Sequence, residues 1–253
     1  MNDILYKRAL RLKEKKYRVE YGQTLTEGVK VIKDLAERGI FPVYLLVDEN
    51  EKEKLKNTFS EFAKKKTVID HGESHLIKKI TDTEKNMVAV GIYDTPSVGI
   101  AENPSKPASF LFHKTQDPLN LGNIIRTCAW FGIGEIFLYE CVEPFNPKVV
   151  RASVGAVFSV KMRMVKNISS FISVNGFRTV AVYENGKIPL REFEFKDGDI
   201  YIFGNEGSGI SRDIIEGAGA SVRIESGAGM RIDSLNLQTA AALFAYSYMM
   251  AKK

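Results

Sequence analysis

No stretch of this sequence stays apolar for the roughly 18 to 20 residues that a helix needs to cross a bilayer. The first 20 residues are charged and lack the apolar core of a secretory leader. With 44% hydrophobic and 26% charged residues, the 253-residue chain has the composition of an ordinary soluble globular protein. We therefore expect a cytoplasmic protein with no membrane partner.

Cysteine and histidine are also scarce. The two cysteines, Cys128 and Cys141, match neither a disulfide framework nor the spacing of a zinc site, and we expect both to be structural. His71 and His75 stand four residues apart, but no third metal ligand is near them in the sequence. We expect no metal site, and we assign no role to the remaining histidine, His113.

Basic residues outnumber acidic ones, 36 to 31, which gives a formal net charge of +5 and favours a polyanionic partner. Residues 1–20 hold seven basic side chains against three acidic ones, with tyrosines interleaved: Lys7, Arg8, Arg11, Lys13, Lys15, Lys16 and Arg18, with Tyr6, Tyr17 and Tyr21. This pattern is typical of phosphate contacts combined with aromatic stacking. It is equally typical of a solvated amphipathic helix, and charge alone does not decide between the two.

Residues 95–107 contain three of the eight prolines together with glycine and serines, a composition that helices and sheets tolerate poorly. We predict a linker at 96–108, between a first domain of residues 1–95 and a second of residues 109–253. Hydrophobic spacing in the first domain predicts alternating helices and strands, and hence a small α/β sandwich. We expect helices at 26–38, 51–63 and 75–80 and strands at 43–47, around 68 and at 87–93.

The alternation resumes after the linker, and the predicted strands are mostly apolar, as expected of a parallel sheet covered by helices on both faces. We expect strands at 109–112, 135–139, 179–183, 199–203 and 221–224 and helices at 121–131, 148–153, 169–174, 210–216 and 234–250. The last helix has almost no charge, so we expect it to be buried nearly all round. Burial within the domain and burial by a partner subunit both remain open.

A glycine cluster at 204–209 follows a predicted strand and precedes a helix, where glycines let backbone amides approach a ligand. Its order, G-x-x-G-x-G, matches neither the dinucleotide fingerprint nor the phosphate-binding P-loop. Glu206 would repel a pyrophosphate, but it could accept hydrogen bonds from a ribose or stabilise an arginine or a sulfonium. A plain tight turn is the alternative.

Polar residues open two of the predicted helices. Asn120 fits a helix N-cap, and Arg126 lies six residues on, or 240° round the helix, so the two cannot share a face. We therefore expect Asn120 to project from the edge of the loop. Arg126 stands among apolar neighbours and needs an ion-pair partner or a ligand. Ser234 is a plausible N-cap of the last helix, and with Asn236 it suits a polar ligand held beside the loop 227–230.

Together these segments resemble the SpoU/TrmH family of RNA methyltransferases. Asn120, Gly122 and Arg126 are similar to its first motif, residues 204–209 to its second, and Ser234, Leu235 and Asn236 to its third. Residues 145–153 with Gly155-Ala156, and residues 18–31, resemble other segments of the family. Many relatives carry an Ile-Pro-Met-like stretch before the third motif, whereas the corresponding stretch here, residues 224–230, is longer and has no proline.

The resemblance implies an α/β protein. Its catalytic domain would be a parallel sheet ending in a deep trefoil knot, preceded by a smaller ribosomal-protein-like RNA-binding domain. The implied activity is methyl transfer from S-adenosylmethionine to a ribose 2′-hydroxyl of structured RNA, with ribosomal RNA favoured. Transfer RNA methylation and a non-catalytic RNA-binding protein are the alternatives. A homodimer formed through the catalytic domain is also implied. A nicotinamide-dependent oxidoreductase is disfavoured, because the dinucleotide fingerprint is missing.

The resemblance also implies three sets of site residues. Arg126 would bind a phosphate and orient the hydroxyl, since an arginine normally stays protonated, although a role as base is left open. The implied catalytic set is Asn120, Arg126, Glu206, Ser234 and Asn236. The implied cofactor-binding set is Phe203, Gly204, Asn205, Gly209, Ile224, Met230 and Leu235. The RNA-binding set comprises Arg8, Arg11, Lys15, Lys16, Arg18 and Arg151.

Overall fold

The computed structural model describes residues 2–81, 87–101, 108–173, 177–205, 207–227 and 234–252. The chain divides into two compact units. The first comprises residues 1–96 together with the later segment 143–158, and the second comprises residues 97–142 and 159–253. Of the linker predicted at 96–108, residues 102–107 lie outside the described residues.

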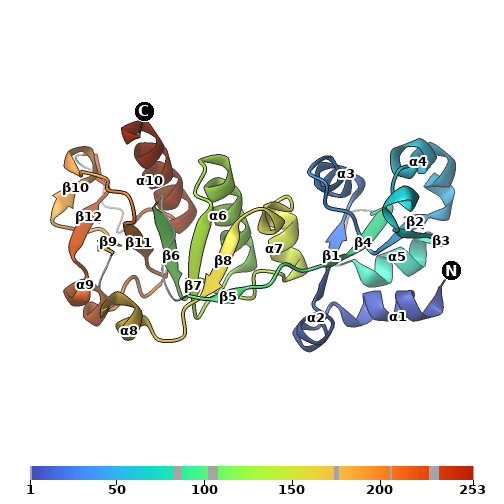
Figure 1. Ribbon diagram of the computed structural model, residues 1–253, viewed down its shortest axis with the longest axis horizontal. Helices are drawn as coiled ribbons and strands as arrows, with labels where there is room; N and C mark the ends of the chain where they lie inside the picture. The colour runs from blue at the N-terminus through green and yellow to red at the C-terminus, as the bar shows by residue number, and fades with distance from the viewer. Residues whose placement is uncertain are drawn as a thin grey trace. The chain divides into compact units, whose positions relative to one another are not determined.

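A four-stranded sheet of order β1-β4-β2-β3 forms the first unit (Figure 1). Its strands are β1 (Gln23–Glu27), β2 (Tyr44–Asp48), β3 (Val68–Gly72) and β4 (Ala89–Asp94). β4 pairs antiparallel with both β1 and β2, while β2 and β3 are parallel. The helices of the unit's amino-terminal part are α1 (Asp3–Arg11), α2 (Lys15–Tyr21), α3 (Val29–Glu37), α4 (Lys52–Phe59) and α5 (Ser74–Ile80). The α/β prediction for this half is therefore confirmed.

The basic amino-terminal stretch folds into α1 and α2. Asn2 caps α1 by accepting hydrogen bonds from the backbone amides of Ile4 and Leu5, and Gly22 ends α2 in the left-handed conformation that glycine favours. Ala9 and Leu12 pack into the core of the unit. The helix predicted to start at Thr26 is wrong at its start: Thr26 lies in β1, and α3 begins only at Val29. Gly28, with a φ of 93°, separates the two elements.

Residues 143–158 return from the second half of the chain to the first unit. They contain α7 (Pro147–Ala152) and a short 3-10 helix (Ala156–Phe158). The hydroxyl of Thr24 donates to the backbone oxygen of Phe145 over 2.6 Å, and α7 packs on β1. Nothing in the sequence had indicated that this segment packs with the amino-terminal sheet.

The second unit contains an eight-stranded sheet of order β10-β12-β9-β11-β6-β7-β8-β5, in which every pairing is parallel. The fully parallel sheet confirms the predicted fold class of this half. Its strands are β5 (Gly99–Ile100), β6 (Ser109–His113), β7 (Glu135–Tyr139), β8 (Lys161–Met164), β9 (Thr179–Val182), β10 (Ile188–Pro189), β11 (Ile200–Phe203) and β12 (Ala220–Arg223). The sequence analysis missed β5, β8 and β10.

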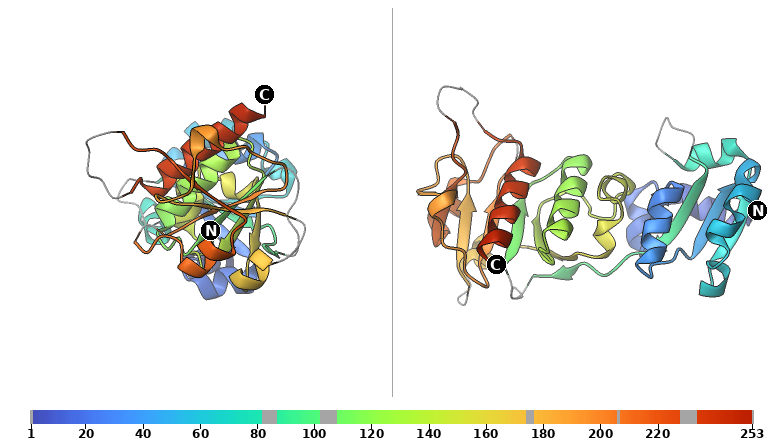
Figure 2. Two further views of the ribbon diagram at one scale, coloured as in Figure 1. Left: turned by 90° about the vertical axis from the view of Figure 1, so that its left-hand side faces the viewer. Right: turned by 90° about the horizontal axis from the view of Figure 1, so that it is seen from above.

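Helices cover both faces of this sheet. Leu111, Phe137 and Ile202 point to the face that carries α8 (Ile168–Ser173) and α9 (Arg212–Gly217). Because side chains alternate along a strand, their neighbours Phe110 and Phe203 point to the opposite face, which is covered by α10 (Leu237–Ala251). The helix α6 (Pro118–Trp130) lies beside α10 (Figures 1 and 2).

Within this chain the last helix is not buried all round, so burial by the domain alone is wrong, and burial by a partner subunit stays a prediction. Phe244 and Tyr248 are buried against the sheet, but Leu243, Tyr246 and Met250 are 42%, 50% and 48% exposed. No helix within the described ranges has the length and apolarity of a membrane span. In the same described ranges, no three His, Cys, Asp or Glu side chains gather closely enough to hold a metal ion.

Candidate active site on helices α6 and α10

The glycine turn that follows β11 closes on itself. The backbone amide of Asn205 donates to the oxygen of Gly209 over 3.1 Å, and the amide of Gly209 donates back over 2.8 Å. A Cβ atom at position 204 would lie 2.3 Å from the carbonyl carbon of Gly209, and Gly209 has a φ of 62°. Both positions therefore require glycine, the first for close approach and the second for backbone conformation.

Asn205 holds this turn together from inside. Its side-chain nitrogen donates to the backbone oxygen of Lys114 over 2.6 Å, and its side-chain oxygen accepts from the backbone amides of Gly207 and Ser208. The Asn205 side chain is thus engaged in anchoring the turn to the end of β6, so we restrict its proposed cofactor contact to the backbone. Glu206, its neighbour in the turn, lies outside the described residues.

The other cofactor-binding candidates differ in exposure. The Phe203 ring is 1% exposed and stacks on Phe112 with centroids 5.4 Å apart, so only its backbone could reach a ligand. Ile224 is half-buried, and Leu235 is 48% exposed. Met230 falls in the segment 228–233, which lies outside the described residues.

Asn120 lies inside α6 and not at the edge of a loop, so that expectation is wrong. Asp117 is the N-cap, because its carboxylate accepts the backbone amide of Leu119 over 3.0 Å, and Pro118 occupies the first turn. The side-chain oxygen of Asn120 accepts a hydrogen bond from the amide of Gln238 on α10. Asn120 therefore ties the first turn of α6 to the first turn of α10.

Asn236, and not Ser234, caps α10. Its side-chain oxygen accepts the backbone amides of Gln238 over 2.9 Å and Thr239 over 3.4 Å. Ser234 is exposed and lies before the cap. The structure thus brings Asn120 and Asn236 close to each other through one residue, Gln238.

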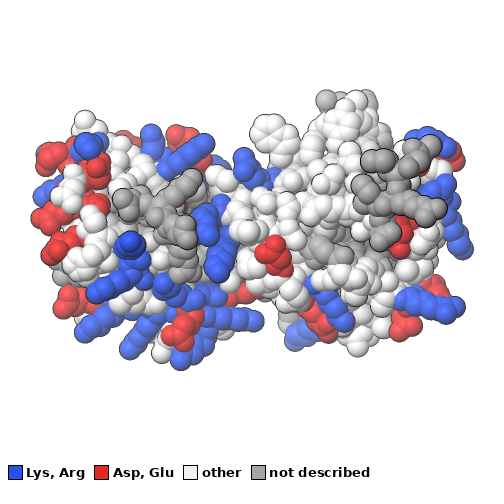
Figure 3. All heavy atoms as spheres, turned by 180° about the vertical axis from the view of Figure 1, so that it is seen from behind, with Lys and Arg blue, Asp and Glu red and all other residues white. Residues whose placement is uncertain are grey.

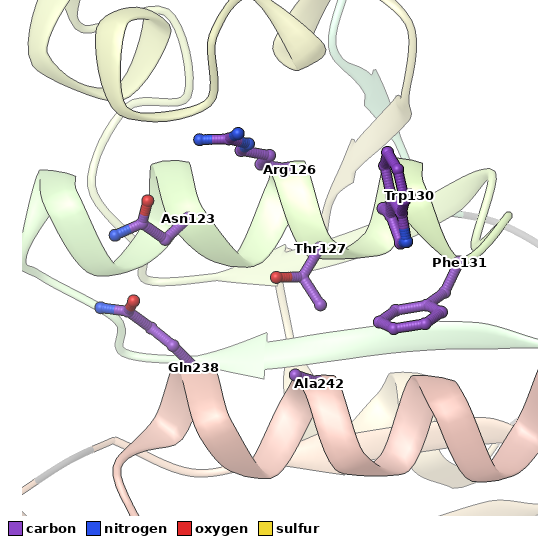
Figure 4. Close-up of a pocket in the computed structure, with 7 residues that line it drawn as sticks. All are labelled: Asn123, Arg126, Thr127, Trp130, Phe131, Gln238 and Ala242. Carbon is purple, nitrogen blue, oxygen red and sulfur yellow. The ribbon is translucent and has the colours of Figure 1, made fainter.

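Arg126 is exposed on α6. Across the described part of the chain, no hydrogen bond or ion pair to its guanidinium is found. It lines an open pocket of about 600 Å³ between the two helices (Figure 4). The pocket is lined by Asn123, Arg126, Thr127, Trp130, Phe131, Gln238 and Ala242. The sequence indicated that Arg126 needs an ion-pair partner or a ligand. Because no ion pair to Arg126 is found among the described residues, a ligand in the pocket remains the expectation.

Trp130 and Gln238 are site residues that the sequence analysis missed. Trp130 is 84% exposed, which is unusual for so large an aromatic side chain. Its spacing of four residues from Arg126 places both on one side of α6 and could have drawn attention to it. Gln238 follows Asn236 by two residues, but nothing in the sequence indicates its hydrogen bond across to Asn120.

Two of the six arginines and lysines predicted to contact RNA are engaged inside the first unit. Arg18 is 5% exposed, pairs with Glu143 at 2.7 Å and donates to two backbone oxygens, those of Leu12 and Lys13. Arg151 pairs with the buried Glu27 at 3.1 Å. Because Arg18 is almost fully buried, we withdraw it from the RNA-binding set. The Arg151 side chain is 28% exposed beside its ion pair, so its contact with RNA stays a prediction.

The remaining four lie on α1 and α2. Arg8 is half-buried, and Arg11, Lys15 and Lys16 are exposed. These side chains are accessible, so their predicted contact with RNA stays a prediction.

Burial shifts the pKa values of three titratable groups, His113, Cys128 and Cys141, toward their neutral forms. Burial lowers the pKa of His113, with Lys114 acting in the same direction, and the imidazole stacks on Tyr139 at 5.4 Å. Burial raises the pKa of Cys141 to about 11 and raises that of Cys128 further. Both thiols are free, which agrees with the structural role expected of them.

Two family models match the chain. Residues 107–246 match the SpoU rRNA Methylase family, and residues 5–90 match the MRM3-like substrate binding domain. Among solved structures, an AdoMet-bound rRNA methyltransferase from Sinorhizobium meliloti has a TM-score of 0.80 and 26% identity, covering 99% of this chain and 95% of that one. A putative RNA methyltransferase of the TrmH family from Porphyromonas gingivalis also has a TM-score of 0.80, at 23% identity, covering 98% of each chain, which supports the fold alone.

Curated relatives are similar over part of their length. The 23S rRNA (guanosine(2553)-2′-O)-methyltransferase RlmP of Bacillus subtilis is 27% identical over 66% of this chain and 66% of its own. An uncharacterized tRNA/rRNA methyltransferase of Synechocystis is 30% identical over 56% of this chain and 53% of its own. The chain thus spans less than two thirds of these relatives. The model that matches residues 107–246 covers more than half of the chain, and this protein therefore belongs to the SpoU rRNA methylase family.

Proposed function

We propose that this protein transfers the methyl group of S-adenosylmethionine to a ribose 2′-hydroxyl of structured RNA, with ribosomal RNA as the favoured substrate. The exposed Arg126 on the α6–α10 face carries the proposal, because it lines an open pocket and no ion pair engages it in the described ranges. The match to a substrate-binding domain and the name of the Bacillus subtilis relative support an RNA substrate.

S-adenosylmethionine fits the residues of the glycine turn. Gly204 and Gly209 leave no room for side chains, so backbone groups there can approach a ligand closely. The backbone at Phe203, Gly204, Asn205 and Gly209, with the partly exposed Ile224 and Leu235, would hold it, and we keep Met230 in the set. The cofactor supplies a methyl group on a sulfonium that is already activated for displacement, so the protein's own task concerns the hydroxyl.

We assign Arg126 the binding of an RNA phosphate and the orientation of the 2′-hydroxyl. A hydroxyl must lose its proton as it attacks, and a group within hydrogen-bond reach must guide that loss. A guanidinium stays protonated in proteins, so orientation and charge stabilisation suit it better than proton removal. Asn120 and Asn236 are joined through Gln238, which lines the same pocket as Arg126. Glu206 and Ser234 complete the proposed catalytic set.

We propose further that two copies associate through the α6–α10 face. Leu119, Arg126 and Trp130 fall on one stripe of α6, since seven and eleven residues correspond to nearly whole turns. Leu243, Tyr246 and Met250 form the matching stripe of α10, and these apolar side chains are between 42% and 84% exposed. Exposed apolar surface of this kind is typical of subunit interfaces. A partner seated there would add walls to the pocket of Arg126.

Light scattering tests the dimer. Leu243→Glu with Tyr246→Glu should give a monomer, because the two charges would be buried at the interface. Lys52→Gln with Lys56→Gln, on exposed positions of α4, gives the same change in net charge and should leave the dimer intact. A wild-type protein whose mass by light scattering is that of a monomer would contradict the proposal.

The trefoil knot and the cytoplasmic location are parts of the same proposal. Membership of the family supports the knot. A bacterial relative named for 23S rRNA supports the location, because that RNA lies in the bacterial cytoplasm.

Incubation with methyl-labelled S-adenosylmethionine and separate pools of ribosomal and transfer RNA tests the function. The proposal expects label in ribosomal RNA, resistant to alkaline cleavage at the modified nucleotide because the 2′-hydroxyl is blocked. Label confined to transfer RNA would select the alternative substrate. Label on a base would contradict ribose methylation, and the absence of label from every pool would favour a non-catalytic RNA-binding protein.

A further inference from the structure

The helices α1 and α2 carry a ladder of cations and aromatic rings. The rings of Tyr17 and Tyr21, one turn apart on α2, stack with centroids 5.9 Å apart and planes 23° from parallel. Arg8 lies 4.6 Å over the Tyr21 ring, and Arg11 lies 5.4 Å over the Tyr17 ring. Lys16 also lies over Tyr17, at 4.6 Å. Each ring is therefore in contact with the other ring and with at least one cation.

The ladder connects the two helices and fixes its own cations. Arg8 and Arg11 come from α1, three residues apart and so on one side of that helix, whereas both tyrosines come from α2. Arg11 also donates a hydrogen bond to the Tyr21 hydroxyl over 3.2 Å. Stacking of a guanidinium on a ring leaves its charge intact and restricts its rotamers. Binding to these arginines then costs less side-chain entropy than binding to freely rotating ones.

Positive charge dominates the surface around the ladder. Figure 3 shows Lys and Arg side chains gathered along the lower margin of the first unit, where α1 and α2 lie. Three acidic residues belong to the same helices and their junction, namely Asp3, Glu14 and Glu20, and Glu14 pairs with Lys16 at 3.4 Å. Arg18 pairs with Glu143, and between residues 2 and 21 this leaves six other basic residues against the three acidic ones. The surface is thus suited to a row of phosphates.

We propose that the α1–α2 ladder binds the sugar–phosphate backbone of a base-paired RNA helix, and that Tyr17 and Tyr21 serve to hold the arginines and not to stack on RNA bases. The inference rests on the proposed RNA methyltransferase function and deepens it by naming the form of RNA that the first unit reads. Proteins that bind single strands offer open aromatic faces to successive bases. Here the rings are already occupied by one another and by cations, while planar guanidinium forks match phosphate oxygens. Base-paired RNA is recognised mainly through its backbone and shape.

Fluorescence anisotropy with the full-length protein, without cofactor, tests the inference. The probes are an RNA hairpin of about 16 base pairs and a single-stranded oligouridine of similar length. The hairpin should bind about tenfold or more tightly than the single strand, with little dependence on its base sequence. The salt dependence should be steep between about 50 mM and about 200 mM. Equal or tighter binding of oligouridine would overturn the inference.

Variants locate the binding on the ladder. Arg8→Gln with Arg11→Gln should weaken hairpin binding about tenfold and lower the slope of log K against log salt by about 2, one for each lost phosphate contact. Lys52→Gln with Lys56→Gln, the same charge change on exposed positions of α4, should leave both quantities unchanged. Unchanged binding and slope in the arginine variant would overturn the inference.

Tyrosine variants separate the two roles of the rings. Tyr17→Leu with Tyr21→Leu should weaken hairpin binding as the arginine variant does, because the guanidiniums lose their support. Selective loss of oligouridine binding would instead show base stacking and overturn the inference. Methylation of RNA by the wild type, measured in parallel, distinguishes the failures: retained methylation with hairpin binding insensitive to Arg8→Gln/Arg11→Gln refutes only the ladder, whereas a wild type that neither binds nor methylates RNA refutes the proposed function too.

Discussion

Arg18 and Arg126 have different sequence surroundings, and their environments in the fold are the reverse of what those surroundings suggest. Arg18, from the basic amino-terminal stretch, is 5% exposed and pairs with Glu143. Arg126, from an apolar stretch, is exposed beside an open pocket, and no ion pair engages it in the described ranges. The arginine that composition favoured for RNA contact is part of the fold, whereas the arginine of a helix that reads as apolar is the one available to a ligand. Local composition thus did not indicate which guanidinium faces solvent.

Loss of Arg18 should have the largest effect on stability. Arg18→Ala leaves the Glu143 carboxylate, whose side chain is 14% exposed, without its cation, and breaking a buried pair typically costs about 3 to 5 kcal/mol. Arg126→Ala should change the free energy of unfolding by less than about 0.5 kcal/mol, as exposed substitutions do. Urea unfolding of both variants measures the difference. Equal stabilities would contradict the contrast between the two arginines.

A double variant sharpens this result. Arg18→Ala combined with Glu143→Ala removes both charges, so its loss of stability should be smaller than the sum of the two single losses. Additive losses would mean that the two side chains do not interact in solution.

Loss of Gly204 tests whether the glycine turn at 204–209, and not only the pocket beside Arg126, belongs to the proposed site. Gly204→Ala places a Cβ 2.3 Å from backbone atoms of Gly209, so the turn must shift, at a cost of about 1 to 3 kcal/mol. We expect S-adenosylmethionine binding to weaken about tenfold or more, measured by calorimetry. Gly207→Ala is the matched control, because the nearest atom to its added Cβ is 3.4 Å away, and it should bind as the wild type does. Normal binding by Gly204→Ala would remove the turn from the proposed cofactor site.

The smallest expected effect is a pH dependence at His113. Burial lowers the pKa of this imidazole, so the folded protein favours its neutral form. Below the ordinary pKa of histidine the unfolded chain takes up a proton that the folded chain does not, and stability falls as the pH drops from about 7 to about 5. His113→Gln should flatten that part of the stability profile measured by thermal unfolding. An unchanged profile would show that His113 titrates normally in the fold.

The sequence was sufficient for the elements and for the order of the motifs. Strand β7 coincides with the predicted 135–139, and β9 agrees with prediction within one residue at each end, because short apolar runs bounded by polar residues identify strands well. Helix α8 begins within one residue of its predicted start, and its predicted end at residue 174 lies outside the described residues. Short edge strands such as β5 and β10, of two residues each, carry too little pattern to be predicted. The fold class and the family followed from motifs that are local in sequence.

Neither the cap of the last helix nor the long-range contacts could be predicted. The choice of Asn236 over Ser234 as N-cap depends on where the chain enters α10, and both residue types cap helices well. The ion pairs of Arg18 with Glu143 and Arg151 with Glu27 join residues more than 120 positions apart. Hydrophobic periodicity describes only local structure, and so it carries no information on pairs of this kind.

Arg126→Ala tests the central claim most directly, with methyl transfer to RNA and S-adenosylmethionine affinity measured on the same preparation. The account predicts that transfer falls at least about 100-fold, as when a group that stabilises the transition state is removed, while cofactor affinity and the unfolding curve stay unchanged. Arg212→Ala, which removes an exposed arginine from α9, should keep wild-type activity. Retained methyl transfer by Arg126→Ala would contradict the account.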